Sequence, residues 1–192
     1  MNKLIPVALM VGVLVATSAF GYGYSSGTQV RDGIRVTGWV KVQVVRDGKI
    51  IYFHEGHNLI TNMGKDIISK EVLGANGNGT VRHNPNATLF IALTTDTGAP
   101  AAGDTTLASE ITTGGLARAT AAYNHANSTT TVVLRKTFTA SASFTAVQKA
   151  GLFNVPPSGS AATTGMLAEN TFSSVNLISG DQITITWTIT IA

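Results

Sequence analysis

The sequence predicts an all-β protein of the β-sandwich class, with a jelly-roll or immunoglobulin-like arrangement. The first reason is that apolar and polar residues alternate in short segments, as in strands with one buried face. The second is that Gly, Pro, Asn and Ser separate these segments at short intervals. The third is composition, because the 192-residue chain is 44% hydrophobic but only 12% charged, whereas ordinary domains carry about 25% charged residues.

The chain is expected to have three parts. Residues 1–19 have the basic start and apolar run of a secretory signal peptide, with Thr17 and Ala19 as the small residues before a cut after Ala19. The alternative is a retained apolar helix. Residues 20–33, rich in Gly, Ser and Tyr, are predicted to form a flexible arm, and residues 34–192 a single β-sandwich domain. The protein is thus predicted to be secreted and extracellular, with membrane contact only through its N-terminal segment before processing.

The segment IRVTGWVKVQVVRDGKIIYFHEG predicts a β-hairpin. Its Asp47-Gly48 dipeptide favours the two positive φ angles of a tight hairpin turn. This turn predicts that Val44 pairs with Ile51, and Val42 with Phe53, on the inner face of the hairpin. The first strand has an apolar face that we predict to serve assembly, made of Ile34, Val36, Val40, Val42 and Val44.

The segment TNMGKDIISKEVLG predicts one short helix near residues 63–73. Asn62 is its predicted cap, and Gly74 its predicted end. After this helix, the runs TLFIALT, GLARATAAY, TTTVVLRKTFTASASF, KAGLFNV and MLAENTF are short and punctuated, so they predict further strands of one sandwich.

The final segment GDQITITWTITIA predicts the most regular strand, because apolar residues alternate with threonine to the end of the chain. Gly180-Asp181 is expected to form the turn before it. We expect this strand to be flanked on both sides, with another subunit as one candidate source of a flanking strand. Its predicted core and assembly residues are Ile183, Ile185, Trp187, Ile189 and Ile191.

Catalytic motifs lack the context that their chemistry requires. Ser25 lies in a literal G-x-S-x-G, but no strand precedes it and no helix follows it, as a nucleophile elbow requires. The sequence contains no paired carboxylates in a recognisable motif and no phosphate-binding loop with a supporting strand and helix. The chain is therefore predicted not to be an enzyme.

Metal-binding residues are also weak candidates. His54, Glu55 and His57 are close in sequence, but His54 and Glu55 should point to opposite faces of a strand. Asp96 and Asp104 are candidate calcium ligands, although both also suit turn positions through their own side-chain hydrogen bonds. We therefore expect no cofactor, with calcium as the alternative.

Charge and side-chain chemistry restrict the partners. The net charge is only +3 and no basic stripe is present, so nucleic acid is not an expected partner. The chain has no cysteine, which excludes disulfides and thiolate chemistry. Three N-x-S/T sites are candidate glycosylation acceptors. They are Asn78, Asn86 and Asn127.

Several stretches in order resemble phage and prophage structural proteins: HNLITNMGKDIISKEVLG, ATLFIALTTDTGAPAAGDTTLASEI, GLARAT, VLRKTFTA, KAGLFN and ISGDQITITWTITI. The resemblance covers about Asn58–Ala192. It implies a virion or tail-associated β module with no catalytic residues to carry over. The export signal in front of it is similar to that of secreted filament subunits, in which a strand of one subunit completes the sheet of its neighbour.

The predicted function is a non-catalytic structural subunit that self-assembles into an extracellular filament or surface appendage by strand exchange. The segment Tyr22–Val44 fits a donated arm, and the expected partners are copies of the same chain. The alternatives are a phage virion or tail protein with an apolar N-terminal anchor, and an archaeal pilin-like subunit. A third class is a glycan-binding or protein-binding surface module, for which Trp39 and Tyr52 are the candidate pair on the outward face of the hairpin.

Overall fold

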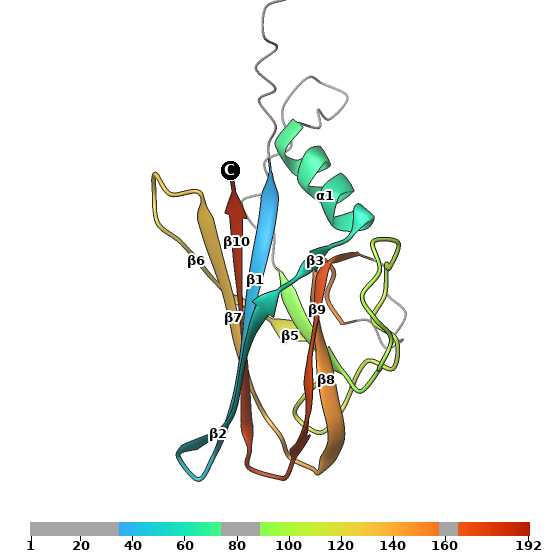
Figure 1. Cartoon of the computed structure of the whole chain (residues 1–192), viewed down its shortest axis with the longest axis vertical. Helices are drawn as coiled ribbons and strands as arrows, with labels where there is room; N and C mark the ends of the chain where they lie inside the picture. The colour runs from blue at the N-terminus through green and yellow to red at the C-terminus, as the bar shows by residue number, and fades with distance from the viewer. Residues whose placement is uncertain (1–34, 74–88, 158–164) are drawn as a thin grey trace, which may run out of the picture. The chain divides into compact units, whose positions relative to one another are not determined.

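The structure is a computed structural model that describes residues 35–73, 89–157 and 165–192. All of these residues belong to one compact unit. Two five-stranded antiparallel sheets form two layers, and the helix α1 (Asn62–Leu73) lies at one end of them (Figure 1). This arrangement confirms the predicted all-β sandwich with one short helix. The predicted signal segment and flexible arm, together with Ile34, lie outside the described residues.

The first sheet contains both ends of the described chain. In spatial order its strands are β2 (Lys49–His57), β1 (Val36–Arg46), β10 (Gln182–Ile191), β7 (Thr131–Thr139) and β6 (Ala122–His125). The last strand of the chain thus lies at the centre of the sheet. It pairs with β1 on one side and with β7 on the other, so the predicted flanking on both sides is confirmed within one subunit.

The second sheet packs against the first and is covered on its other face. In spatial order its strands are β3 (Leu59–Ile60), β9 (Met166–Leu177), β8 (Phe144–Phe153), β4 (Phe90–Thr94) and β5 (Ala119–Thr120). Residues 95–118, which we call the covering segment, connect β4 to β5. Leu107 of this segment forms a small second core with Ala92, Phe153 and Met166.

The main core lies between the two sheets and follows the predicted alternation. Ile183, Ile185 and Trp187 are fully buried, while the intervening threonines face outward. Ile189 is half-buried against the core, but Ile191 is 40% exposed, which corrects its predicted core position. The reason is that Ile191 pairs with Val36 at the end of the sheet, where the strands extend past the core.

The apolar face of β1 is also internal to the subunit. Val40, Val42 and Val44 are fully buried, and β1 pairs along its length with both β10 and β2. The structure therefore places this part of the predicted donated arm inside the sheet of its own subunit.

The hairpin forms, but with a different register from the predicted one. Asp47 and Gly48 have φ angles of 48° and 73°, as the predicted turn requires. A β-bulge between Val44 and Val45 then shifts the pairing by one residue. Val44 pairs with Tyr52 and Val42 with His54, so the predicted pairs with Ile51 and Phe53 are wrong. Because a shift of one residue exchanges the two faces of a strand, Ile51 and Phe53 lie outside and Tyr52 lies inside. 

The helix begins one residue earlier than predicted and has a different cap. The Thr61 hydroxyl accepts a hydrogen bond from the backbone N–H of Gly64 at 2.9 Å and donates one to the carbonyl of Met166 at 2.6 Å. Asn62 is exposed and belongs to the first turn of α1. Thr61 is thus the cap, and it also fixes α1 to β9.

The turn before β10 is closed by a buried carboxylate. Gly180 has a φ of 95°, and Asp181 accepts a hydrogen bond from the backbone N–H of Ile178 at 2.9 Å. The Arg46 guanidinium donates to both Asp181 oxygens at 2.8 and 2.6 Å. Through these bonds the end of β1 is joined to the turn that leads into β10.

We expect stability to fall in acid through Asp181. Its hydrogen bonds from Arg46 lower the pKa of Asp181 below the ordinary value of 3.8. A lowered pKa means that the stabilisation is complete above about pH 4 and is lost as the pH falls through the folded-state pKa. Urea unfolding from pH 6 to pH 2 should show a shallower acid loss for Asp181→Asn than for the wild type. Parallel curves for the two proteins would contradict this role.

Candidate functional site

The first sheet has two open edges among the described residues. β2 pairs only with β1, and β6 pairs only with β7. The outer side of each edge strand therefore presents backbone N–H and C=O groups to solvent. β2 is the longer edge, with nine residues against four in β6.

The exposed edge of β2 is unusually apolar. Ile50, Ile51 and Phe53 are 60%, 46% and 54% exposed, and we call these three residues the edge patch. They lie together because the bulge turns Ile51 and Phe53 to the outer face. Natural proteins usually protect such an edge with charge, proline or a covering element. Charge is present near this edge, at Lys41, Lys49 and Glu55, but among the described residues no proline and no covering element lies over the edge patch.

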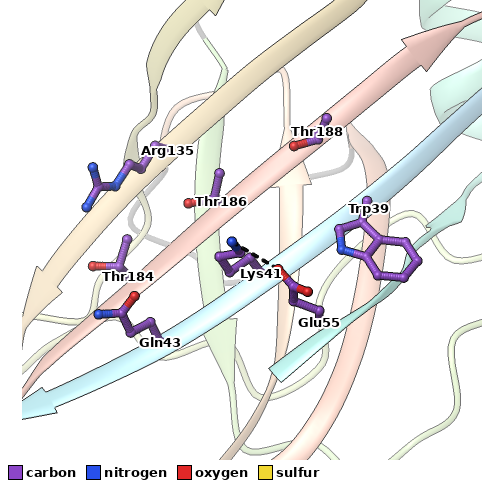
Figure 2. A pocket seen from close by; sticks show the side chains of 8 residues that line it. All are labelled: Trp39, Lys41, Gln43, Glu55, Arg135, Thr184, Thr186 and Thr188. Atoms are coloured by element: carbon purple, nitrogen blue, oxygen red, sulfur yellow. Dashed lines mark ion pairs between the residues drawn. The ribbon is translucent and has the colours of Figure 1, made fainter. Parts of the chain in front are cut away.

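A polar hollow lies beside the edge patch on the outer face of the first sheet. Figure 2 shows its side chains, which come from β1, β2, β10 and β7. Its volume is about 400 Å³. The residues that line it are Trp39, Lys41, Gln43, Glu55, Arg135, Thr184, Thr186 and Thr188.

Ion pairing and ring contacts fix the part of this hollow nearest to β2. Lys41 Nζ lies 2.9 Å from Glu55 Oε1, and the same ammonium lies 5.6 Å from the centre of the Phe53 ring. Trp39 packs edge-on against His57, with ring centres 4.4 Å apart. These contacts pre-order Phe53 and its neighbours on the outer face, so binding a partner there costs little additional side-chain entropy.

Threonine hydroxyls form the opposite side of this face. Thr184 and Thr137 are 2.8 Å apart between their hydroxyl oxygens, and Thr190 and Thr131 are 3.3 Å apart. Cross-strand pairs of this kind stabilise the sheet modestly. The face therefore combines a hydroxyl-rich centre with an apolar border at β2.

Trp39 and Tyr52, the predicted binding pair, lie on opposite faces of the first sheet. Trp39 is 38% exposed on the outer face. Tyr52 faces the core because of the bulge, and its ring lies 6.3 Å from that of Phe172. The prediction that both rings point outward is thus corrected by the same one-residue shift.

The metal candidates occupy different places. His54 is half-buried on the inner face, whereas Glu55 and His57 lie on the outer face, as the alternation predicts. Asp96 forms an ion pair with Lys149, while Asp104 accepts a hydrogen bond from the Ala101 backbone N–H at 2.9 Å. No group of three His, Cys, Asp or Glu suited to a metal occurs in the described ranges.

The remaining candidates are placed only in part. Asn127 is exposed in the turn between β6 and β7. Asn78, Asn86 and Ser25 lie outside the described residues.

Within the described ranges, no helix has the length and apolar character needed to cross a membrane. No family model, curated protein or solved structure matches the chain.

The edge patch was not predictable from regular alternation alone. After the turn, regular alternation predicts Ile51 and Phe53 on the inner face of the hairpin. The signal that was present is the run Lys49-Ile50-Ile51, in which two consecutive isoleucines cannot both face one side of a regular strand.

Proposed function

We propose that the chain is a non-catalytic structural subunit that self-assembles into an extracellular filament or surface appendage, with β2 as its principal contact strand. The observation that carries the proposal is the edge patch on a nine-residue edge strand whose outer side has no partner among the described residues. The partner is a second copy of the chain. The predicted export signal, the low charge and the resemblance to phage structural proteins support the same proposal.

Strand addition uses both properties of this edge. The free backbone groups of β2 pair with a strand of the neighbouring subunit, and the edge patch is covered by its side chains. Burying three large apolar side chains that are about half exposed contributes roughly 1 kcal/mol for each, by the usual transfer values. The backbone hydrogen bonds between the two strands then provide affinity, and the side chains of the edge patch set the register in which the strands pair.

The other edge of the same sheet offers a second strand for pairing. β6 lies at the opposite edge, and its Tyr123 is 64% exposed. Contact between β2 of one subunit and β6 of the next uses two different surfaces, so it leaves both ends of the assembly open. Contact between two β2 strands would use the same surface twice and would stop at a dimer. Filament growth therefore requires either the contact between β2 and β6 or, if two β2 strands pair with each other, another contact between subunits at a different surface.

We expect Ile51→Lys to raise the concentration needed for assembly by roughly tenfold, equivalent to about 1.4 kcal/mol per contact. A charge at the open edge opposes strand pairing without disturbing the core. The matched control is Ile178→Lys, because Ile178 is 48% exposed in the turn before β10 and Ile51 is 46% exposed. Sedimentation of the two variants and the wild type at graded concentrations measures the effect.

The proposal fails if folded Ile51→Lys assembles at the same concentration as the wild type. It also fails if Ile178→Lys is impaired to the same extent, because the effect would then come from added charge alone. Circular dichroism of each variant confirms that the fold is retained.

A further inference from the structure

Three ionisable side chains meet beneath the covering segment. Lys149 lies on β8, and its side chain is only 4% exposed. Its Nζ atom is 2.6 Å from Asp96 Oδ2 and 3.9 Å from Glu169 Oε2. The three residues converge because β8 lies between β4 and β9 in the second sheet, with Asp96 just after β4 and Glu169 on β9.

We propose that Lys149 and Asp96 join spontaneously in an intramolecular isopeptide bond, with Glu169 as the group that transfers the proton. The nucleophile, the electrophile and the acid are all present in this chain. The proposal concerns the finished subunit and does not depend on its assembly into filaments.

The reaction balances without any added reagent. The Lys149 ammonium passes one proton to the Asp96 carboxylate across their 2.6 Å contact, which leaves a neutral amine and a neutral acid. The amine lone pair attacks Asp96 Cγ to form a tetrahedral intermediate. Glu169 delivers its proton to the departing hydroxyl and recovers one from the attacking nitrogen. The products are one secondary amide and one water molecule.

Glu169 lies beside the attacking amine, with its Oε2 atom 3.9 Å from Lys149 Nζ. The Glu169 side chain is 2% exposed, and this burial is the main reason that the pKa of Glu169 rises to about 7. A hydrogen bond with Asp104 and the charge of Asp104 raise this pKa further. The hydrogen bond from the Ala101 backbone N–H and the charge of Lys149 lower it in part. Glu169 therefore holds a proton in a substantial fraction of molecules near neutral pH. The Gly98 backbone N–H donates to Asp96 Oδ2 at 3.2 Å, which helps to hold the carboxyl group in position for attack.

The position of the two groups favours amide formation. Holding the amine against the carboxyl carbon replaces an encounter in solution, and such positioning lowers barriers strongly. The Lys149 hydrogen bond lowers the pKa of Asp96, so the ion pair is the state from which the reaction starts. Amide formation then removes the Lys149 charge from a position where its side chain is only 4% exposed. The Asp96 side chain is 25% exposed, so the released water has a path to solvent.

The bond would act as a covalent clamp on the second sheet. It links residues 53 positions apart and fastens the start of the covering segment to the central strand β8. The chain has no cysteine and therefore no disulfide for this purpose. A cross-link of this kind restricts the unfolded chain as a disulfide does.

High-resolution mass spectrometry of the purified full chain tests the proposal. The mass should be lower than the sequence mass, for the observed N-terminus, by one water molecule or about 18 Da. Trypsin should not cleave after Lys149, and it should release one branched peptide containing both Lys149 and Asp96. A wild-type chain with its full sequence mass overturns the proposal.

Variants distinguish the bond from another source of water loss. Asp32-Gly33 and Asp47-Gly48 can lose water by closing a succinimide ring, with the same change in mass. Lys149→Met should abolish the loss of water if the loss comes from the isopeptide bond, and a loss that persists in this variant overturns the proposal.

The role of Glu169 is tested separately. Glu169→Gln should fold yet keep its full mass, and a bond that forms in this variant would remove the role assigned to Glu169. The control Asp181→Asn changes a distant buried carboxylate and should retain the loss.

Discussion

A chain that ends at Gly180 is expected not to fold. This truncation removes β10 from the centre of the first sheet and leaves β1 and β7 without their shared partner. It also removes Ile183, Ile185 and Trp187, all fully buried. At about 1.5–3 kcal/mol for each buried side chain, their loss amounts to roughly 5–9 kcal/mol, comparable with the whole stability of a typical domain.

Circular dichroism and limited proteolysis of the shortened chain measure this effect. The matched control ends at Thr190, which removes only Ile191 and Ala192 at the exposed end of β10. That control should remain folded. A stable and soluble product ending at Gly180 would show that the central position of β10 is not required for the fold.

The second large effect is expected at the buried ion pair between Arg118 and Glu110. The side chains are 1% and 3% exposed, and Arg118 Nε donates to Glu110 Oε1 at 2.9 Å. The guanidinium also lies 3.6 Å from the centre of the Phe153 ring. Arg118→Met should lower the free energy of unfolding by about 3–5 kcal/mol, because it leaves the Glu110 carboxylate buried without its partner.

A double variant separates the unpaired charge from lost packing. Arg118→Met combined with Glu110→Gln removes both charges and should recover part of the loss. Urea unfolding of the single and double variants gives the two free energies. A loss below about 1 kcal/mol in Arg118→Met would mean that water reaches Glu110 and that the pair is not a structural anchor of the covering segment.

The elements that the sequence predicts well are those whose signal is local. The threonine alternation of residues 183–190 predicts β10 and its buried face, and Asp47-Gly48 predicts the hairpin turn. Both depend only on residues that are neighbours in the chain. The short helix near residues 63–73 is predictable for the same reason, because its start and stop signals lie within its own segment.

The bulge and the helix cap depend on distant residues and were not predictable in the same way. A bulge changes the register according to how two strands fit together across the sheet. Thr61 and Asn62 are both good cap residues. The choice between them is decided by the carbonyl of Met166 on β9, to which the Thr61 hydroxyl donates.

The ionic clusters depend on the order of strands in the second sheet. Asp96, Lys149 and Glu169 meet only because β4, β8 and β9 are neighbours, and no local pattern in the sequence specifies that order. Asp96 and Asp104 were therefore considered as calcium ligands on composition and turn chemistry alone. The structure instead gives Asp96 a cationic partner from its own chain, Lys149.

The proposed use of β2 as a contact strand is tested most directly by amide hydrogen exchange. Exchange is compared between dilute protein and protein at high concentration, with peptides that cover β2 and, as an internal reference, β10, which is already paired on both sides. The account predicts that exchange in β2 slows markedly at high concentration while exchange in β10 stays constant. Unchanged exchange in β2, or a protein that remains monomeric at every concentration, would contradict it.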